Sequence, residues 1–367
     1  MDIQVAQHCG RMEERLYLLQ RHLPELLKLE QLVETAGDRV RTATALNVEV
    51  AGQQLPVPVV ELGNPSPEVP AIGFFAGVHG VERIGSRVVL SWLHSLIHRL
   101  QWDRSWQRRM EQVRVVFMPM VNPGGIWLGR RANPNGVDLM RNAPIEATGR
   151  VPFLVGGHRL GPFLPWYRGR RGRPMEAEAE ALMETARSRL FDAPFALSLD
   201  CHSGFGRQDR IWCSYARSHR PIQYIAELYA LRRLLKTSYP YHHPYLIEPQ
   251  SVNYTTHGDL WDYLYDEACE REPERTYLPL TLEMGSWLWV RKNPRQLFDF
   301  HGYFNPLIEH RLQRVLRQHL LLFDFLVSAT AYWHNWTPTG IERERFLEEA
   351  VRLWFTENGV GNDTGSF

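Results

Sequence analysis

The sequence has few cysteines and no long apolar run. Its four cysteines show neither metal-ligand spacing nor the density of a disulfide framework, which favours a compartment with reduced thiols. No apolar stretch reaches the ~20 residues of a membrane span. The first residues also lack the basic and apolar regions of a secretory signal. We therefore expect a cytoplasmic protein with no membrane partner.

An excess of charge of one sign is also absent. The formal net charge is +1, with 23% charged and 44% hydrophobic residues, as in ordinary globular proteins. A balanced charge gives no general attraction to nucleic acid, so we expect no nucleic-acid partner. We find no internal repeat, and no pattern fixes the oligomeric state.

Apolar periodicity predicts an α/β fold, with parallel strand pairs in one sheet and helices on its faces. Strands are expected at 39–62 (a pair turning near Gly52), 71–75, 113–118, 195–199 and 277–282. Helices are expected at 11–36 (divided or kinked by Pro24), 84–100, 176–190, 222–235, 306–334 and 341–356. The Asn-Pro-Gly-Gly stretch at 122–125 is expected to be a turn. The basic and aromatic cluster at 166–173 is interpreted as a solvated surface loop.

The expected elements divide the chain into three parts. Residues 1–38 would form an N-terminal helical segment, and residues 39–335 a large domain that carries every motif described below. Residues 336–367 would form a C-terminal helix and a frayed tail beginning near Asn358.

Residues suited to metal binding or to acid–base chemistry follow three expected strands. His79 and Glu82 lie three residues apart in a glycine-rich turn between a strand and a helix. His202 follows a second strand, and Glu283 follows a third. A His-x-x-Glu pair alone more often forms surface hydrogen bonds, but ligand sites of open α/β sheets lie where strands end. The sequence therefore predicts that these side chains meet.

Two histidines and one glutamate are a suitable set of ligands for one zinc ion. Three protein ligands leave a coordination position open, which is typical of catalytic zinc sites rather than structural ones. Zinc generates a nucleophile from water near neutral pH. A nearby carboxylate can orient that water and carry its proton to a leaving amine, and Glu283 is free for this task.

Four motifs in this order resemble the zinc carboxypeptidase family. They are His79-Gly-Val-Glu82, Asp138-Leu-Met-Arg141-Asn142, Asp200-Cys-His202-Ser-Gly and Leu282-Glu283-Met, and they span about residues 70–290. The resemblance implies a carboxypeptidase A-like (phosphorylase/hydrolase-like) fold, with a mixed central β-sheet and helices on both of its faces. It also implies that residues 39–335 are the catalytic domain. It also implies a bacterial, intracellular type of member, since no activation propeptide or signal is evident.

The resemblance assigns the centre of the site residue by residue. His79, Glu82 and His202 match the ligands of a single Zn²⁺, and Glu283 matches the general base. Arg131 matches the arginine that polarises the scissile carbonyl and stabilises the oxyanion, with the adjacent Arg130 as an alternative. Asp138 matches the carboxylate that orients a metal-bound imidazole.

The resemblance also assigns the substrate end of the site. Arg141 matches the arginine that pairs with a terminal carboxylate. Tyr254 matches the mobile tyrosine that closes over substrate, although Tyr263 and Tyr265 lie nearby. Met140 stands where the family usually has asparagine, and methionine offers no donor. Binding of a free C-terminus is then weaker, or the substrate is atypical.

Three functions are compatible with these motifs. The favoured one is a zinc metallocarboxypeptidase that hydrolyses a C-terminal peptide or peptide-like amide. The alternative is a deacylase of N-acyl amino acids resembling succinylglutamate desuccinylase and aspartoacylase, which share the His-Gly-x-Glu turn and the Asp-Leu-x-Arg block. The helical C-terminal part favours the carboxypeptidase, because those deacylases tend to end in a β-rich part. The third is an inactive scaffold, which only Met140 supports. The substrate is thus expected to be a peptide or an acyl-amino acid.

Overall fold

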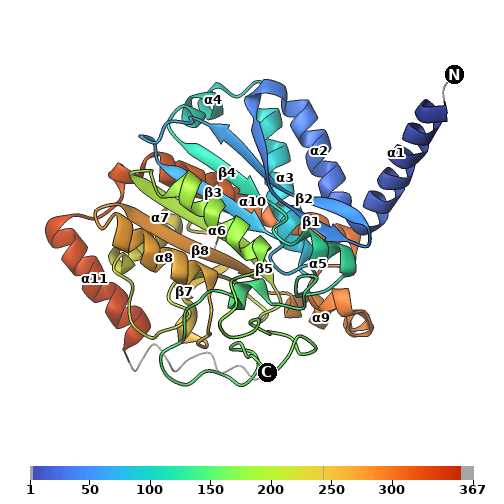
Figure 1. Cartoon of the computed structure of the whole chain (residues 1–367). Coiled ribbons are helices and arrows are strands. Elements are labelled where there is room, and N and C mark those ends of the chain that lie inside the picture. The colour runs from blue at the N-terminus through green and yellow to red at the C-terminus, as the bar shows by residue number, and fades with distance from the viewer. Residues whose placement is uncertain (1–2, 243, 357–367) are drawn as a thin grey trace.

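The computed structural model describes residues 3–242 and 244–356, and the expected frayed tail lies outside them. One eight-stranded sheet forms the centre of the molecule, in the order β1-β2-β4-β3-β5-β8-β6-β7 (Figure 1). The strands are β1 (Arg41–Val50), β2 (Gln53–Gly63), β3 (Ala71–Ala76), β4 (Arg114–Met118), β5 (Phe195–Ser203), β6 (Asp209–Cys213), β7 (Tyr245–Pro249) and β8 (Thr276–Met284).

The sheet is mixed, as the family resemblance implies. The inner strands β4, β3, β5 and β8 run parallel to one another, and the β6–β7 pair is also parallel. The β1–β2, β2–β4 and β8–β6 pairs are antiparallel. The connections leave β3 on one side through β4 and return on its other side at β5, so a topological switch point lies between β3 and β5. Ligand sites of open α/β sheets lie at such points.

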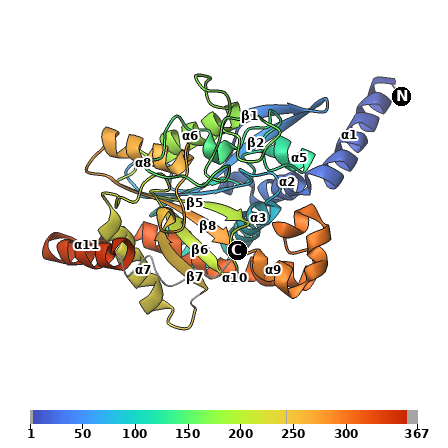
Figure 2. The same ribbon diagram turned by 90° about the horizontal axis from the view of Figure 1, so that it is seen from below.

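Helices cover both faces of the sheet. The longer ones are α1 (Ile3–His22), α2 (Pro24–Ala36), α3 (Arg83–Arg99), α6 (Ala177–Leu190), α7 (Ile225–Ser238), α8 (Leu260–Arg271), α10 (Glu309–Ala331) and α11 (Gly340–Phe355). The shorter ones are α4 (Arg104–Met110), α5 (Pro123–Leu128) and α9 (Trp287–Lys292). Figure 2 shows α6 and α8 on one face and α3, α7 and α10 on the other. No helix among the described residues is long and apolar enough to cross a membrane.

An aromatic cluster fixes β3, the strand that leads into the turn carrying His79 and Glu82. Phe74 is fully buried and stacks on Phe117 of β4 and on Phe323 of α10, with ring centroids 5.5 and 4.6 Å apart. Trp92 of α3 lies 5.1 Å from the same ring. Burying large aromatic rings from four elements stabilises their relative positions, since each ring removes a large apolar area from water. The end of β3 is therefore held rigidly.

Three local expectations were wrong. The stretch at 122–125 begins helix α5 instead of a turn, because the Asn122 side chain accepts the amide of Gly125 and Pro123 fits the first helical position. Strands β5 and β8 continue to Ser203 and Met284, beyond their expected ends. The cluster at 166–173 is not wholly solvated, because Arg168 is 3% exposed and donates to the carbonyls of Arg141 and Ile145.

Candidate active site

His79 and Glu82 project from the tight turn that joins β3 to α3. Glu82 is the residue immediately before the helix, and its amide donates to the carbonyl of His79. The turn packs closely on α5, since a Cβ atom on Gly80 would lie 2.1 Å from the carbonyl carbon of Gly125. Only glycine permits this approach. The turn therefore presents both side chains in one defined geometry.

His202 reaches the same point from the end of β5. Alternate residues of a strand face the same side, so Asp200 lies beside His202. His202 Nε2 is 2.7 Å from Asp200 Oδ2, which also accepts the indole N–H of Trp261 at 2.9 Å. The carboxylate thereby fixes the imidazole ring and its tautomer. Asp200 has an orienting role that the sequence analysis did not assign, although its spacing of two from His202 was a signal for it.

His79, Glu82 and His202 form a buried donor set that fits one metal ion. Their ligand atoms all lie within 4.8 Å of one another. Nδ1 of His79 is 2.8 Å from Glu82 Oε1, and Nδ1 of His202 is 3.0 Å from Glu82 Oε2. Each imidazole turns Nε2 toward a carboxylate, His79 at 3.0 Å from Asp138. Donation from Nε2–H leaves the Nδ1 lone pair directed at the common centre, as a ligated histidine requires.

Arg131 joins the two carboxylates around His79. Its Nη1 donates to Glu82 and its Nε to Asp138, both at 2.9 Å. Burial raises the pKa of Asp138, but the charge of Arg131 and the imidazole of His79 outweigh it and hold that pKa well below its usual range. Asp138 is thus an anion beside His79. Arg130, the alternative in the sequence, has an exposed side chain, whereas Arg131 faces the site.

Glu283 lies across the donor set on β8. It is paired with His202 in the register of β5 and β8, and it is 7% exposed. The amide of Phe205 donates to its carboxylate at 2.9 Å. Burial and the negative charge of Glu82 raise the pKa of Glu283 to about 8. A carboxyl group poised near neutrality can both accept and release a proton.

Arg141 and Tyr254 lie together on the other side of the site. Arg141 is 5% exposed, and its guanidinium donates to the carbonyl of Met140 at 3.4 Å and to the hydroxyl oxygen of Tyr254. The Tyr254 ring packs 5.7 Å from that of Phe205. The Met140 side chain instead belongs to the apolar core, so its part in substrate binding stays a prediction.

Asn305 braces the backbone on both sides of Glu82. Its Oδ1 accepts the amide of Ile84 at 2.9 Å, and its Nδ2 donates to the carbonyl of Val81 at 2.8 Å. The hydroxyl of Ser203, next to His202, donates to the carbonyl of Phe304 at 2.8 Å. The segment 304–305 therefore holds both the Glu82 turn and the end of β5. It shows no helical or strand periodicity, and the sequence analysis did not identify it.

We expect Asn305→Ala to weaken zinc binding by about tenfold, because outer contacts of metal sites are typically worth 10–100-fold in affinity. The substitution leaves every donor atom in place and frees only the backbone around Glu82. Competition with a chromophoric chelator measures the dissociation constant. Asn305→Asp keeps the acceptor for the amide of Ile84, so it should lose less zinc affinity than Asn305→Ala.

Asn253→Ala is the matched control, because Asn253 is exposed and its amide donates only to Glu248 among the described contacts. A fall in melting temperature with unchanged zinc affinity in Asn305→Ala would show that Asn305 stabilises the fold without positioning Glu82.

The fold and this donor set define a metal-binding protein of the α/β class, with one metal position at the switch point of a mixed sheet. Residues 13–285 match the zinc carboxypeptidase family. The chain belongs to the zinc carboxypeptidase family, and His79, Glu82 and His202 are suited to hold its one metal ion.

Comparison with individual proteins agrees with this membership. A stretch of 92 residues is 32% identical to carboxypeptidase SOL1 of Arabidopsis thaliana, but it covers only 24% of the chain and 19% of that protein. The structure is similar to thrombin activatable fibrinolysis inhibitor, with a TM-score of 0.60, 18% identity and coverage of 82% of this chain and 74% of that one.

Two further solved structures share the fold. Carboxypeptidase A from Helicoverpa armigera matches with a TM-score of 0.58 and 14% identity, covering 83% of this chain and 71% of that one. A metallo-carboxypeptidase from Burkholderia cenocepacia matches with a TM-score of 0.51 and 14% identity, covering 83% and 68%. At these identities the likeness shows the fold alone.

Proposed function

We propose that the protein is a zinc metallocarboxypeptidase that hydrolyses a C-terminal peptide or peptide-like amide bond. The observation that carries the proposal is the convergence of one metal donor set and a proton-accepting carboxyl at neighbouring strand ends, with two arginines from the segment after α5 beside them. His79, Glu82 and His202 would hold the zinc. When bound, zinc supplies a Lewis acid that activates water and polarises the amide.

The residues around the metal position would transfer the proton and stabilise the charge that develops during the reaction. Glu283 takes a proton from the attacking water and delivers it to the leaving amine, for which its raised pKa is suited. Arg131 stabilises the negative charge that develops on the carbonyl oxygen. It is 19% exposed and is held in place by Glu82 and Asp138, so it needs little rearrangement to act.

Arg141 and Tyr254 would bind the carboxylate end of the substrate. A guanidinium can grip a carboxylate with two parallel hydrogen bonds. The backbone of Arg141 is fixed from both sides, because Arg168 donates to its carbonyl at 3.1 Å and Gly258 packs against it. A Cβ atom on Gly258 would lie 2.0 Å from that carbonyl oxygen, and its φ of +69° also favours glycine. This support favours a positioned anion-binding arginine over an ordinary surface arginine.

The deacylase alternative differs in the C-terminal part of the chain. Those deacylases tend to carry a β-rich part after the catalytic motifs. Here the described residues after β8 contain helices and turns but no strand. This observation favours the carboxypeptidase. The cytoplasmic location stays a prediction from the sequence.

Arg141→Ala is expected to lower kcat/KM for substrates with a free terminal carboxylate. The loss should correspond to about 1.5–3 kcal/mol, the range for a hydrogen bond to a charged group. The matched C-terminal amides should change much less, because they carry no anion. The measurement is kcat/KM for an acid–amide pair of otherwise identical peptides, in wild type and variant. A wider screen of peptides and acyl-amino acids, read by product mass, supplies the pair.

Arg130→Ala serves as the control, since it removes an exposed guanidinium one residue from Arg131. Equal losses on the acid and the amide in Arg141→Ala would mean that Arg141 does not bind a terminal carboxylate. Turnover of acyl-amino acids with no turnover of peptides would favour the deacylase.

A further inference from the structure

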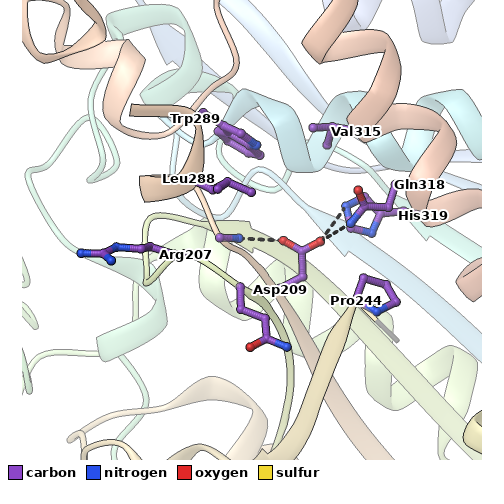
Figure 3. Close-up of a pocket in the computed structure, with 10 residues that line it drawn as sticks. Arg207, Asp209, Pro244, Leu288, Trp289, Val315, Gln318 and His319 are labelled. Atoms are coloured by element: carbon purple, nitrogen blue, oxygen red, sulfur yellow. Dashed lines mark hydrogen bonds and ion pairs between the residues drawn. The ribbon is translucent and has the colours of Figure 1, made fainter. Parts of the chain in front are cut away.

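A cavity lies behind the strand end that carries Glu283. Its volume is about 250 Å³, and it opens between the start of β6, helix α9 and helix α10 (Figure 3). The residues that line it include Asp209, Leu288, Trp289, Val315, Gln318 and His319. None of these is a residue of the candidate active site. The cavity therefore needs an explanation of its own.

Asp209 supplies the only carboxylate among these lining residues. Its Oδ1 accepts the amide of Gly285 at 2.9 Å, and its Oδ2 accepts from Gln318 at 2.6 Å. Its side chain is 14% exposed, and burial raises its pKa to about 6. It is still ionised at neutral pH. Figure 3 shows this carboxylate at the centre of the lining residues.

The charge of Asp209 has no cationic partner within the described residues. Its one ion-pair contact is His319 Nε2 at 3.8 Å, but burial lowers the pKa of His319 to about 3, so that imidazole is neutral. His319 Nδ1 is instead 2.9 Å from the hydroxyl of Tyr245. The charge of His242 also lowers the pKa of His319. The Arg207 side chain points away from Asp209 (Figure 3). A carboxylate that is desolvated without a cation raises the free energy of the folded protein unless a partner compensates its charge.

We propose that this cavity binds a small organic amine, with its ammonium group on Asp209 and its apolar part against Leu288, Trp289 and Val315. The ammonium supplies the missing positive charge and donates to the carboxylate. An indole is a favourable neighbour for a cation. An apolar wall with one charged anchor is the usual composition of a small-molecule site. This site goes beyond the proposed peptide hydrolysis, and its occupant would lie next to Gly285, two residues after Glu283.

Calorimetry on the zinc-loaded full chain tests the proposal, with phenethylamine as the probe and 2-phenylethanol as its neutral counterpart. We expect the amine to bind and the alcohol to bind at least tenfold more weakly. Asp209→Asn keeps an acceptor for the amide of Gly285 but removes the negative charge. It should therefore weaken binding of the amine by about 10–100-fold, as expected for the loss of a hydrogen bond to a charged group. Wild-type affinity should be about tenfold lower at pH 5 than at pH 7.5, because protonation of Asp209 removes the anion.

Two further variants keep the proposal testable if Asp209→Asn folds poorly. Val315→Phe fills the cavity with the carboxylate intact and should abolish binding. Glu283→Gln should leave binding unchanged, which separates this cavity from the active site. Equal binding of amine and alcohol, unaltered affinity in Val315→Phe, or loss of binding in Glu283→Gln would each overturn the proposal.

Discussion

Glu283→Gln is expected to give a folded, zinc-loaded protein whose turnover is lower by about 10²–10⁴-fold, the usual contribution of a general acid or base. The amide is nearly isosteric with the carboxyl, and its oxygen can still accept the amide of Phe205. It cannot accept a proton from the attacking water. The measurement combines kcat on a peptide substrate with zinc content and melting temperature.

Glu178→Gln is a matched control for this substitution. Glu178 on α6 is also a buried carboxyl, at 4% exposure, and burial raises its pKa as well. It has no described contact with the metal donors, so its replacement should leave turnover within about twofold, as expected for a group outside the reaction. Wild-type turnover in a folded Glu283→Gln protein would remove Glu283 from the mechanism.

His202→Ala and His79→Ala are each expected to lose most of the bound zinc, and with it nearly all activity. A catalytic zinc with three protein ligands depends on each of them. Removal of His202 also leaves Asp200 buried without the imidazole that it orients. The measurement is zinc per chain by mass spectrometry of the metal after dialysis, with circular dichroism as a check on folding.

His98→Ala provides the comparison, because His98 is an exposed histidine on α3, near the opposite end from Glu82. It should retain one zinc per chain in this proposal. Full zinc occupancy in His202→Ala would show that the ligand set is wrong, whatever the effect on turnover.

The sequence was most informative where function rests on local pattern. The His79–Glu82 turn, the strand that ends near His202 and the strand that carries Glu283 all follow from apolar runs broken by glycine or polar residues. The parallel order of those strands then predicts that their ends meet. The structure brings these side chains together, and their catalytic roles await the variants described above.

Long-range contacts were beyond the reach of the same reasoning. Asn305 lies in a segment without periodicity, and only the fold brings it to the Glu82 turn. Arg168 belongs to a cluster whose composition is typical of a surface loop, yet it is buried because three acceptors satisfy it. Hydrogen bonds between distant residues leave no periodic signal in either partner. Such residues are therefore found only from coordinates.

The Asn305 brace also bears on how the protein is made. The bond from Ile84 to Asn305 joins residues 221 positions apart. During synthesis, every candidate zinc ligand and Glu283 leave the ribosome before Asn305 does. Pairings of such large sequence separation form slowly, because a long loop must close first. A nascent chain halted at residue 285, where the family match ends, would display all the donors with the Glu82 turn unbraced. Zinc capture is therefore expected late in biogenesis, after release of the segment around Asn305, and a fragment ending at 285 should be a poor zinc binder.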